Sequence, residues 1–188
     1  MPSLASVICS LACLLAVADA RPAVVPRAGT RLEPSGLYNI FPESPDLSKD
    51  SLGFHLETYN NASQVEQVLV FSGIPAGAKT CSVGWDQGER IERVFIVKGG
   101  NALAGVKQLS GFPDNEVTYN TIKPFADGEE FGGADFTNWD DLPAQGHNIG
   151  SVDCAETLYL KVALRDKNGN TKVFLNQDKT NGLAITYS

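Results

Sequence analysis

The stretch VEQVLVFSGIPAGAKTCSVGW, from Val65 to Trp85, decides the fold. Residues 65–71 are mostly apolar, which is typical of a strand buried on both faces. The Pro and Gly in residues 74–77 predict a turn, and residues 80–85 alternate as a second strand. That second strand carries Cys81. The stretch therefore predicts two strands at the centre of a hydrophobic core.

The rest of the chain repeats this pattern of short strands and turns. Asn60-Asn61 is expected to form a turn, and Asn168-Gly169 has the composition of a tight hairpin turn. Eight or nine strands without a long amphipathic helix predict an all-β fold, namely a single-domain antiparallel β-sandwich, with a closed β-barrel as the alternative. Besides the opening stretch, the expected strands are residues 52–59, 91–97, 117–122, 149–152, 158–165, 171–176 and 183–187.

The N-terminal residues are expected to lie outside this domain. Residues 1–20 have an apolar run that ends in Ala18-Asp19-Ala20, which predicts a cleaved signal peptide. Residues 21–35 are rich in Pro and Arg and predict an extended linker or a pro-segment. The β-sandwich domain is expected to span residues 36–188.

Export determines the prediction for the cysteines. The signal peptide removes two of the four cysteines and leaves Cys81 and Cys154. Two cysteines in an oxidising compartment most simply form one disulfide bond, and two buried free thiols are the alternative.

The composition limits the classes of partner. The chain has a net charge of −7 at pH 7, which disfavours nucleic acid as a partner. After the signal peptide no apolar run approaches the length of a membrane span, so membrane insertion is not expected. We expect a secreted protein, extracellular or associated with a cell wall, whose partner is a glycan or an extracellular protein. The sequence does not indicate an oligomeric state.

The segment 124–160 is strongly acidic, with eight Asp and Glu residues and no Lys or Arg. A solvated acidic rim is the simplest interpretation. A weak alternative is a calcium site at Asp135, Asp140 and Asp141, because calcium takes several oxygen ligands at once. A second alternative is a glycosidase-like pair of carboxylates within Asp127–Asp141. Apart from this calcium candidate, no cofactor or metal is expected.

Two further residues are candidate sites. Trp139 lies among polar residues in FTNWDDLP, and an exposed aromatic ring beside carboxylates is suited to contact a sugar. Trp139, Asp135, Asp140 and Asp141 therefore form a possible ligand surface, although Trp139 could instead close one end of the sandwich. Asn61-Ala62-Ser63 is a sequon for N-glycosylation, which predicts a glycan at Asn61.

The sequence contains no catalytic signature. There is no G-x-S-x-G nucleophile elbow and no glycine-rich phosphate loop followed by Lys. We therefore expect a protein that is not an enzyme.

Four landmarks carry a resemblance to a known family: VFSGIPAGAKTCSVGW at residues 70–85, FTNWDDLP at 136–143, the late Cys154, and the closing GLAITY at 182–187. Together they resemble the But-two-type C-terminal domain family of secreted fungal proteins, which is named for a ubiquitin-three-binding protein. The resemblance covers about Leu52 to Tyr187. It implies a β-sandwich-like domain with a Cys81–Cys154 disulfide, and it supplies no catalytic residues. The intracellular role in the family name conflicts with the signal peptide and is not transferred.

The functional expectation is a secreted, non-catalytic β-sandwich that binds a glycan or protein at the fungal cell surface or wall. One alternative is a secreted carbohydrate-active hydrolase that uses carboxylates of the Asp127–Asp141 loop. Another alternative is a secreted effector that binds a host protein.

Overall fold

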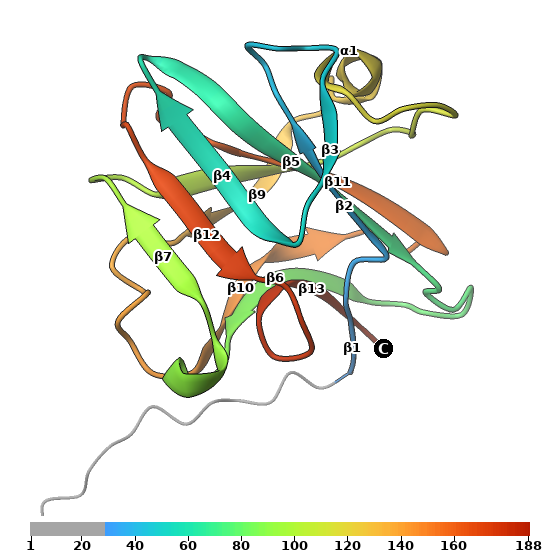
Figure 1. Ribbon diagram of the computed structural model, residues 1–188. Coiled ribbons are helices and arrows are strands. Elements are labelled where there is room, and N and C mark those ends of the chain that lie inside the picture. Colours follow the sequence, from blue (N-terminus) through green and yellow to red (C-terminus); the bar gives the residue numbers. More distant parts are fainter. Residues whose placement is uncertain (1–28) are drawn as a thin grey trace, which may run out of the picture.

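The computed structural model describes residues 29–188, which form two packed layers of antiparallel strands (Figure 1). The expected signal peptide and residues 21–28 of the expected linker lie outside the described residues. The strands are β1 (Thr30–Leu32), β2 (Gly36–Ile40), β3 (Ser48–Asp50), β4 (Gly53–Tyr59), β5 (Ala62–Ser72), β6 (Cys81–Gln87), β7 (Phe95–Lys98), β8 (Leu103–Gln108), β9 (Glu130–Asp135), β10 (Gln145–Val152), β11 (Thr157–Leu164), β12 (Lys172–Asn176) and β13 (Gly182–Tyr187). The helical elements are short: α1 (Tyr119–Ile122) and the 3₁₀ turns η1 (Arg90–Glu92) and η2 (Lys123–Phe125).

The smaller layer is a 4-stranded sheet in the order β1-β13-β6-β10. The larger layer has nine strands, in the order β7-β12-β4-β5-β11-β8-β9, with β2 paired to β5 and β3 paired to β2. The larger sheet is curled because β4 and β2 share one edge of the long strand β5. The sheets remain separate, which confirms the antiparallel sandwich and not the closed barrel.

The decisive stretch passes from one sheet to the other. Its first strand, β5, lies in the larger sheet, and its second strand, β6, lies in the smaller sheet. Gly73, with a φ of 92°, turns the chain between them in a conformation that other residues rarely adopt. Leu69 on β5 and Val83 on β6 are both fully buried, so the core lies between the layers, as the sequence predicts.

The folded domain begins earlier than expected. Residues 30–32 form β1, which pairs with β13, and the Arg31 guanidinium donates to the Asp86 carboxylate at 3.0 Å. Leu32 packs against the main core. The prediction of a linker up to residue 35 is therefore wrong for these residues. A three-residue strand is too short to produce a detectable alternation.

The expected hairpin at Asn168-Gly169 is also wrong. Strand β11 pairs with β5 and β8, whereas β12 pairs with β4 and β7. The β4–β5 hairpin lies between β11 and β12, and the connection between them crosses its tip. There the Thr58 amide donates to the Thr171 carbonyl at 2.8 Å, and the Asn60 amide donates to the Asn170 side chain at 3.2 Å.

A second, smaller core covers the outer face of the larger sheet. The segment after β8 buries Leu109, Val117 and Ile122 against Ile40 and Val68. The strand expected at residues 117–122 is replaced by α1. Its start is fixed by a capping box, in which the side chains and amides of residues 118 and 121 bond reciprocally.

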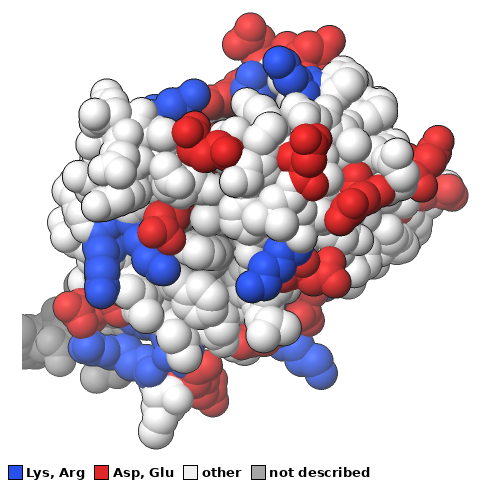
Figure 2. Space-filling view, turned by 45° about the horizontal axis from the view of Figure 1, so that its top comes forward, with Lys and Arg blue, Asp and Glu red and all other residues white. Residues whose placement is uncertain are grey.

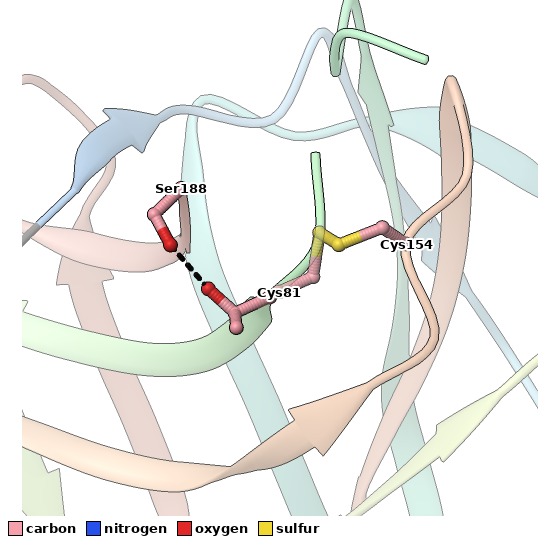
Figure 3. The surroundings of a disulfide bond; sticks show 4 residues. Cys81, Cys154 and Ser188 are labelled. Carbon is pink, nitrogen blue, oxygen red and sulfur yellow. Dashed lines mark hydrogen bonds between the residues drawn. A yellow bond between two sulfur atoms is a disulfide. The ribbon is translucent and has the colours of Figure 1, made fainter. Parts of the chain in front are cut away.

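The two cysteines that remain after the expected cleavage form a disulfide bond. Cys81, at the start of β6, is joined to Cys154, which follows β10, with a Cα–Cα distance of 5.4 Å (Figure 3). The alternative of free thiols is therefore wrong. Beside the bridge, Ser188 bonds to Thr80 through both backbone and side chain, which ties the last residue of the chain to the same corner. No helix within residues 29–188 is long and apolar enough to cross a membrane.

Candidate functional site

A polar pocket of about 190 Å³ opens where the β9–β10 connection meets the η1–β7 segment. Arg90, Arg93, Phe95, Asp140 and Asp141 line it. The strand expected over residues 91–97 begins instead with the turn η1, so β7 starts at residue 95 and its first residue contributes to the pocket. The structure thus joins part of the acidic segment to residues that lie more than 40 positions earlier in the chain.

Arg93 holds the two sides of the pocket together. Its guanidinium donates to the Gly88 carbonyl at 2.6 Å and to the Asp140 carbonyl at 2.9 Å, and it also bonds the Leu142 carbonyl. Burial lowers the pKa of Arg93, and the nearby charge of Arg90 lowers it further. Because an arginine remains a cation in proteins, its charge balances several carbonyl dipoles that converge on it.

Gln87 fixes the same connection from the core side. Its side-chain amide group donates to the carbonyls of Trp139 and Leu142, each at 3.1 Å, and of Pro143 at 2.8 Å. An amide group has only two hydrogens, so these three acceptors share them. The connection is therefore shaped by two buried donors rather than by its own sequence.

The two pocket carboxylates have different roles. The Asp140 carboxylate accepts the Val97 amide at 3.3 Å on the free edge of β7. The Asp141 carboxylate pairs with Arg90 at 2.7 Å, and 84% of the Asp141 and 64% of the Arg90 side-chain surface is exposed. Asp140 is thus committed to the fold, whereas the Arg90–Asp141 pair faces solvent.

The expected calcium site is not assembled. The Asp135 carboxylate accepts the Thr137 amide at 2.9 Å in a local turn and does not line the pocket. Asp140 and Asp141 have the partners just described. Within the described part of the chain, no group of three or more His, Cys, Asp or Glu residues is placed to hold a metal ion.

Trp139 closes the end of the core and does not line the pocket. It is half-buried and lies edge-on to Trp85, with ring centres 6.3 Å apart, and to His147 at 4.3 Å. His147 in turn stacks flat on Trp85 at 3.7 Å. Of the expected ligand surface, the structure keeps Asp140 and Asp141 at the pocket and assigns Trp139 a packing role.

Phe95 is the aromatic residue of the pocket. Its ring packs edge-on against Trp85 at 5.8 Å, so the core supports it from behind. Sequence reasoning missed Phe95 and both pocket arginines, because the acidic segment was selected for its lack of cations. The only signal in the sequence is the unusual pairing of Arg90 and Arg93 around the apolar Ile91.

Exposed apolar residues adjoin the pocket in the chain. Ile91 is 94% exposed, Val94 54% and Leu142 40%, and each is the sequence neighbour of a lining residue. We call these three residues the apolar rim. Exposed apolar side chains that gather around a polar pocket are typical of an interaction surface.

The remaining carboxylates of the acidic loop lie elsewhere. Asp127 borders a different, shallow pocket of about 320 Å³ beside Gln108 and Ser110. Glu130 pairs with Arg165 at 2.8 Å on the outer face of the larger sheet. On the face drawn in Figure 2, acidic and basic side chains are interspersed across uncharged surface.

The sequon residue Asn61 lies at the tip of the β4–β5 hairpin. Asn60 and Asn61 have φ values of 53° and 61°, which confirms the expected turn. Asn61 is exposed, whereas Ser63 is buried in β5. Glycosylation of Asn61 stays a prediction.

A hydrogen-bonded loop after β12 positions the start of the η1 segment. The buried Asn181 side chain accepts the Gly88 amide at 2.8 Å. The Asp178 carboxylate holds Asn181 in place, because it accepts the amides of Thr180 and Asn181, both at 2.9 Å, and the Asn181 side chain at 3.0 Å. Burial alone raises the pKa of Asp178, but the hydrogen bonds from Thr180 and Asn181 together hold that pKa below its usual value.

We expect this loop to make the domain sensitive to acid. The folded state holds the pKa of Asp178 below its unfolded value of about 3.9, so the unfolded chain takes up the proton first. The stability from Asp178 is therefore complete above that pH and is lost as the pH falls through the folded pKa. Asp178→Asn should be less stable than the wild type at pH 7, and the difference should shrink below pH 4.

Urea unfolding between pH 7 and pH 2 measures this difference. The exposed Asp153→Asn is the control for removing one carboxylate. A constant gap between wild type and Asp178→Asn at every pH would contradict the role of Asp178.

Comparison with known proteins gives no match: no family model fits the chain, and no curated protein aligns with it. The resemblance to the But-two-type family stays a prediction.

Proposed function

We propose that this protein is a secreted, non-catalytic β-sandwich that binds a glycan or a protein partner at the fungal cell surface or wall. The observation that carries the proposal is the polar pocket together with its apolar rim. Ile91 exposes nearly its whole side chain to solvent, which has a cost in solubility unless a partner covers it.

Export is supported by the signal-peptide pattern of residues 1–20 and by the Cys81–Cys154 disulfide, because such bonds persist in oxidising compartments. The fungal origin and the cell-surface setting rest on the family resemblance. That resemblance assigns no active site, in keeping with a binding role.

The pocket chemistry favours a glycan over a protein. The exposed Arg90 and Asp141 present donors and acceptors side by side above the Phe95 ring. Sugar hydroxyls both donate and accept hydrogen bonds, and the C–H face of a sugar packs on an aromatic ring. A protein partner, such as a host protein bound by an effector, would depend more on the apolar rim.

Incubation of the purified protein with insoluble chitin, β-glucan and cellulose tests the proposal. We expect depletion from the supernatant by at least one polymer without release of soluble sugar. Arg90→Ala should weaken retention about tenfold, the scale of one lost charged hydrogen bond. Arg165→Ala is the matched control, because it removes another exposed arginine that pairs with a carboxylate.

Each other outcome is informative. Release of soluble sugar that Asp→Asn changes within Asp127–Asp141 abolish would refute the non-catalytic proposal and support the hydrolase. Protein that stays in the supernatant with all three polymers would refute glycan binding and leave the protein partner.

A further inference from the structure

The pocket separates its polar groups into fixed and exchangeable ones. Arg93 is held by three backbone carbonyls, and the Asp140 carboxylate is held by the Val97 amide. The Arg90–Asp141 pair is exposed, and an exposed ion pair contributes little to stability. A ligand can therefore replace that pairing at small cost, whereas Arg93 and Asp140 form the walls of the pocket.

The lining is electrically balanced. It contains two arginines and two aspartates, so their formal charges cancel. An anionic ligand would gain from Arg90 but would meet the Asp141 carboxylate beside it, and a cation would meet the reverse. An uncharged ligand with several hydroxyl groups uses both partners, since a hydroxyl donates to the carboxylate and accepts from the guanidinium.

The size of the pocket limits the ligand. At about 190 Å³ the pocket lies below the roughly 300–1,000 Å³ of sites that hold drug-sized molecules. It corresponds to about six water molecules at ~30 Å³ each, which is enough for one sugar ring and too little for a chain segment. One wall is the Phe95 ring, which the Trp85 ring supports.

From these three observations we propose that the pocket binds a single uncharged sugar ring, at a chain end or a branch tip. Phe95 packs on the C–H face of the ring, and Arg90 and Asp141 bind its hydroxyls. The next sugar of the chain contacts the apolar rim at Ile91. This inference rests on the proposed glycan-binding function and adds the part of the glycan that is recognised.

Competition with soluble sugars tests the inference on the full mature chain. The probes are glucose, N-acetylglucosamine, mannose and galactose at millimolar concentration, each added to protein that a polymer retains. We expect at least one of these monosaccharides to release the protein. Titration of that sugar should show a loss of affinity of about tenfold for Arg90→Ala and for Asp141→Asn, one charged hydrogen bond in each case.

Arg165→Ala and Glu130→Gln are the matched controls, because they break an equally short ion pair on another face. They should leave the affinity unchanged. Polymer retention that no monosaccharide reverses would overturn the single-ring inference while the proposed binding function stands. Release by glucuronic acid alone would overturn the uncharged ligand. Absence of retention on every polymer would instead refute the glycan-binding function itself.

Discussion

Replacement of both Cys81 and Cys154 by alanine should lower the free energy of unfolding by about 4 kcal/mol, the chain-entropy value for closing a long loop. The bridge joins residues 73 positions apart, so its loss frees a large part of the unfolded chain. The folded state should keep its topology, because β6 still pairs with β10 and β13. The burial of Cys81 adds a small cavity cost to the same sign.

Urea unfolding of the double variant and the wild type measures this difference. Intact mass with and without reduction should differ by two hydrogens for the wild type and should not differ for the variant. Ser188→Ala is the control for the same corner, since it removes only the Thr80 hydroxyl bond and should change stability by under about 1 kcal/mol. A loss of stability in the double variant no larger than that of Ser188→Ala would contradict the prediction.

The class of the fold follows from local sequence. The alternation in residues 52–59 predicts a strand with one buried face, and β4 buries Phe54 and Leu56 accordingly. The Asn60-Asn61 turn follows from the tolerance of Asn for positive φ. Strand identity and turn chemistry depend on neighbouring residues, so a single sequence carries them.

The partners of each strand do not follow from local sequence. Asn168-Gly169 indicates a reversal of the chain, but the strands on either side accept other neighbours because the β4–β5 hairpin occupies the space between them. Alternation says which residues face the core, not which strand lies alongside. Residues 117–122 show the converse, since three apolar side chains at strand spacing also fit a capped helical turn that packs on a sheet.

The candidate site was half visible in the sequence. Composition singled out Asp140 and Asp141, and both lie at the pocket. It did not reveal that Arg90 and Arg93 would meet them, because only the tertiary fold brings η1 to the β9–β10 connection. The interpretation of Trp139 as a ligand platform followed from its polar neighbours, yet its ring turns inward onto Trp85.

Trp85→Ala should lower the free energy of unfolding by about 3–5 kcal/mol, the range for removing a fully buried tryptophan. Trp85 is 1% exposed and its ring contacts His147, Phe95 and Phe136, with the stacked His147 ring at 3.7 Å. Its removal leaves a cavity between the two sheets. It also removes the support behind Phe95, so any ligand affinity of the pocket should fall with stability.

Comparison with Trp139→Ala separates packing from binding. Trp139 is half-buried and meets Trp85 only by its edge, so its loss should cost clearly less than the loss of Trp85. Both are measured by urea unfolding, and Trp85→Phe, which restores most of the ring volume, should recover much of the stability. If Trp139→Ala instead abolished glycan retention while stability held, the aromatic platform inferred from the sequence would be correct and the pocket would be the wrong site. Equal losses of stability for the two variants would show that the end of the core, and not its centre, carries the packing energy.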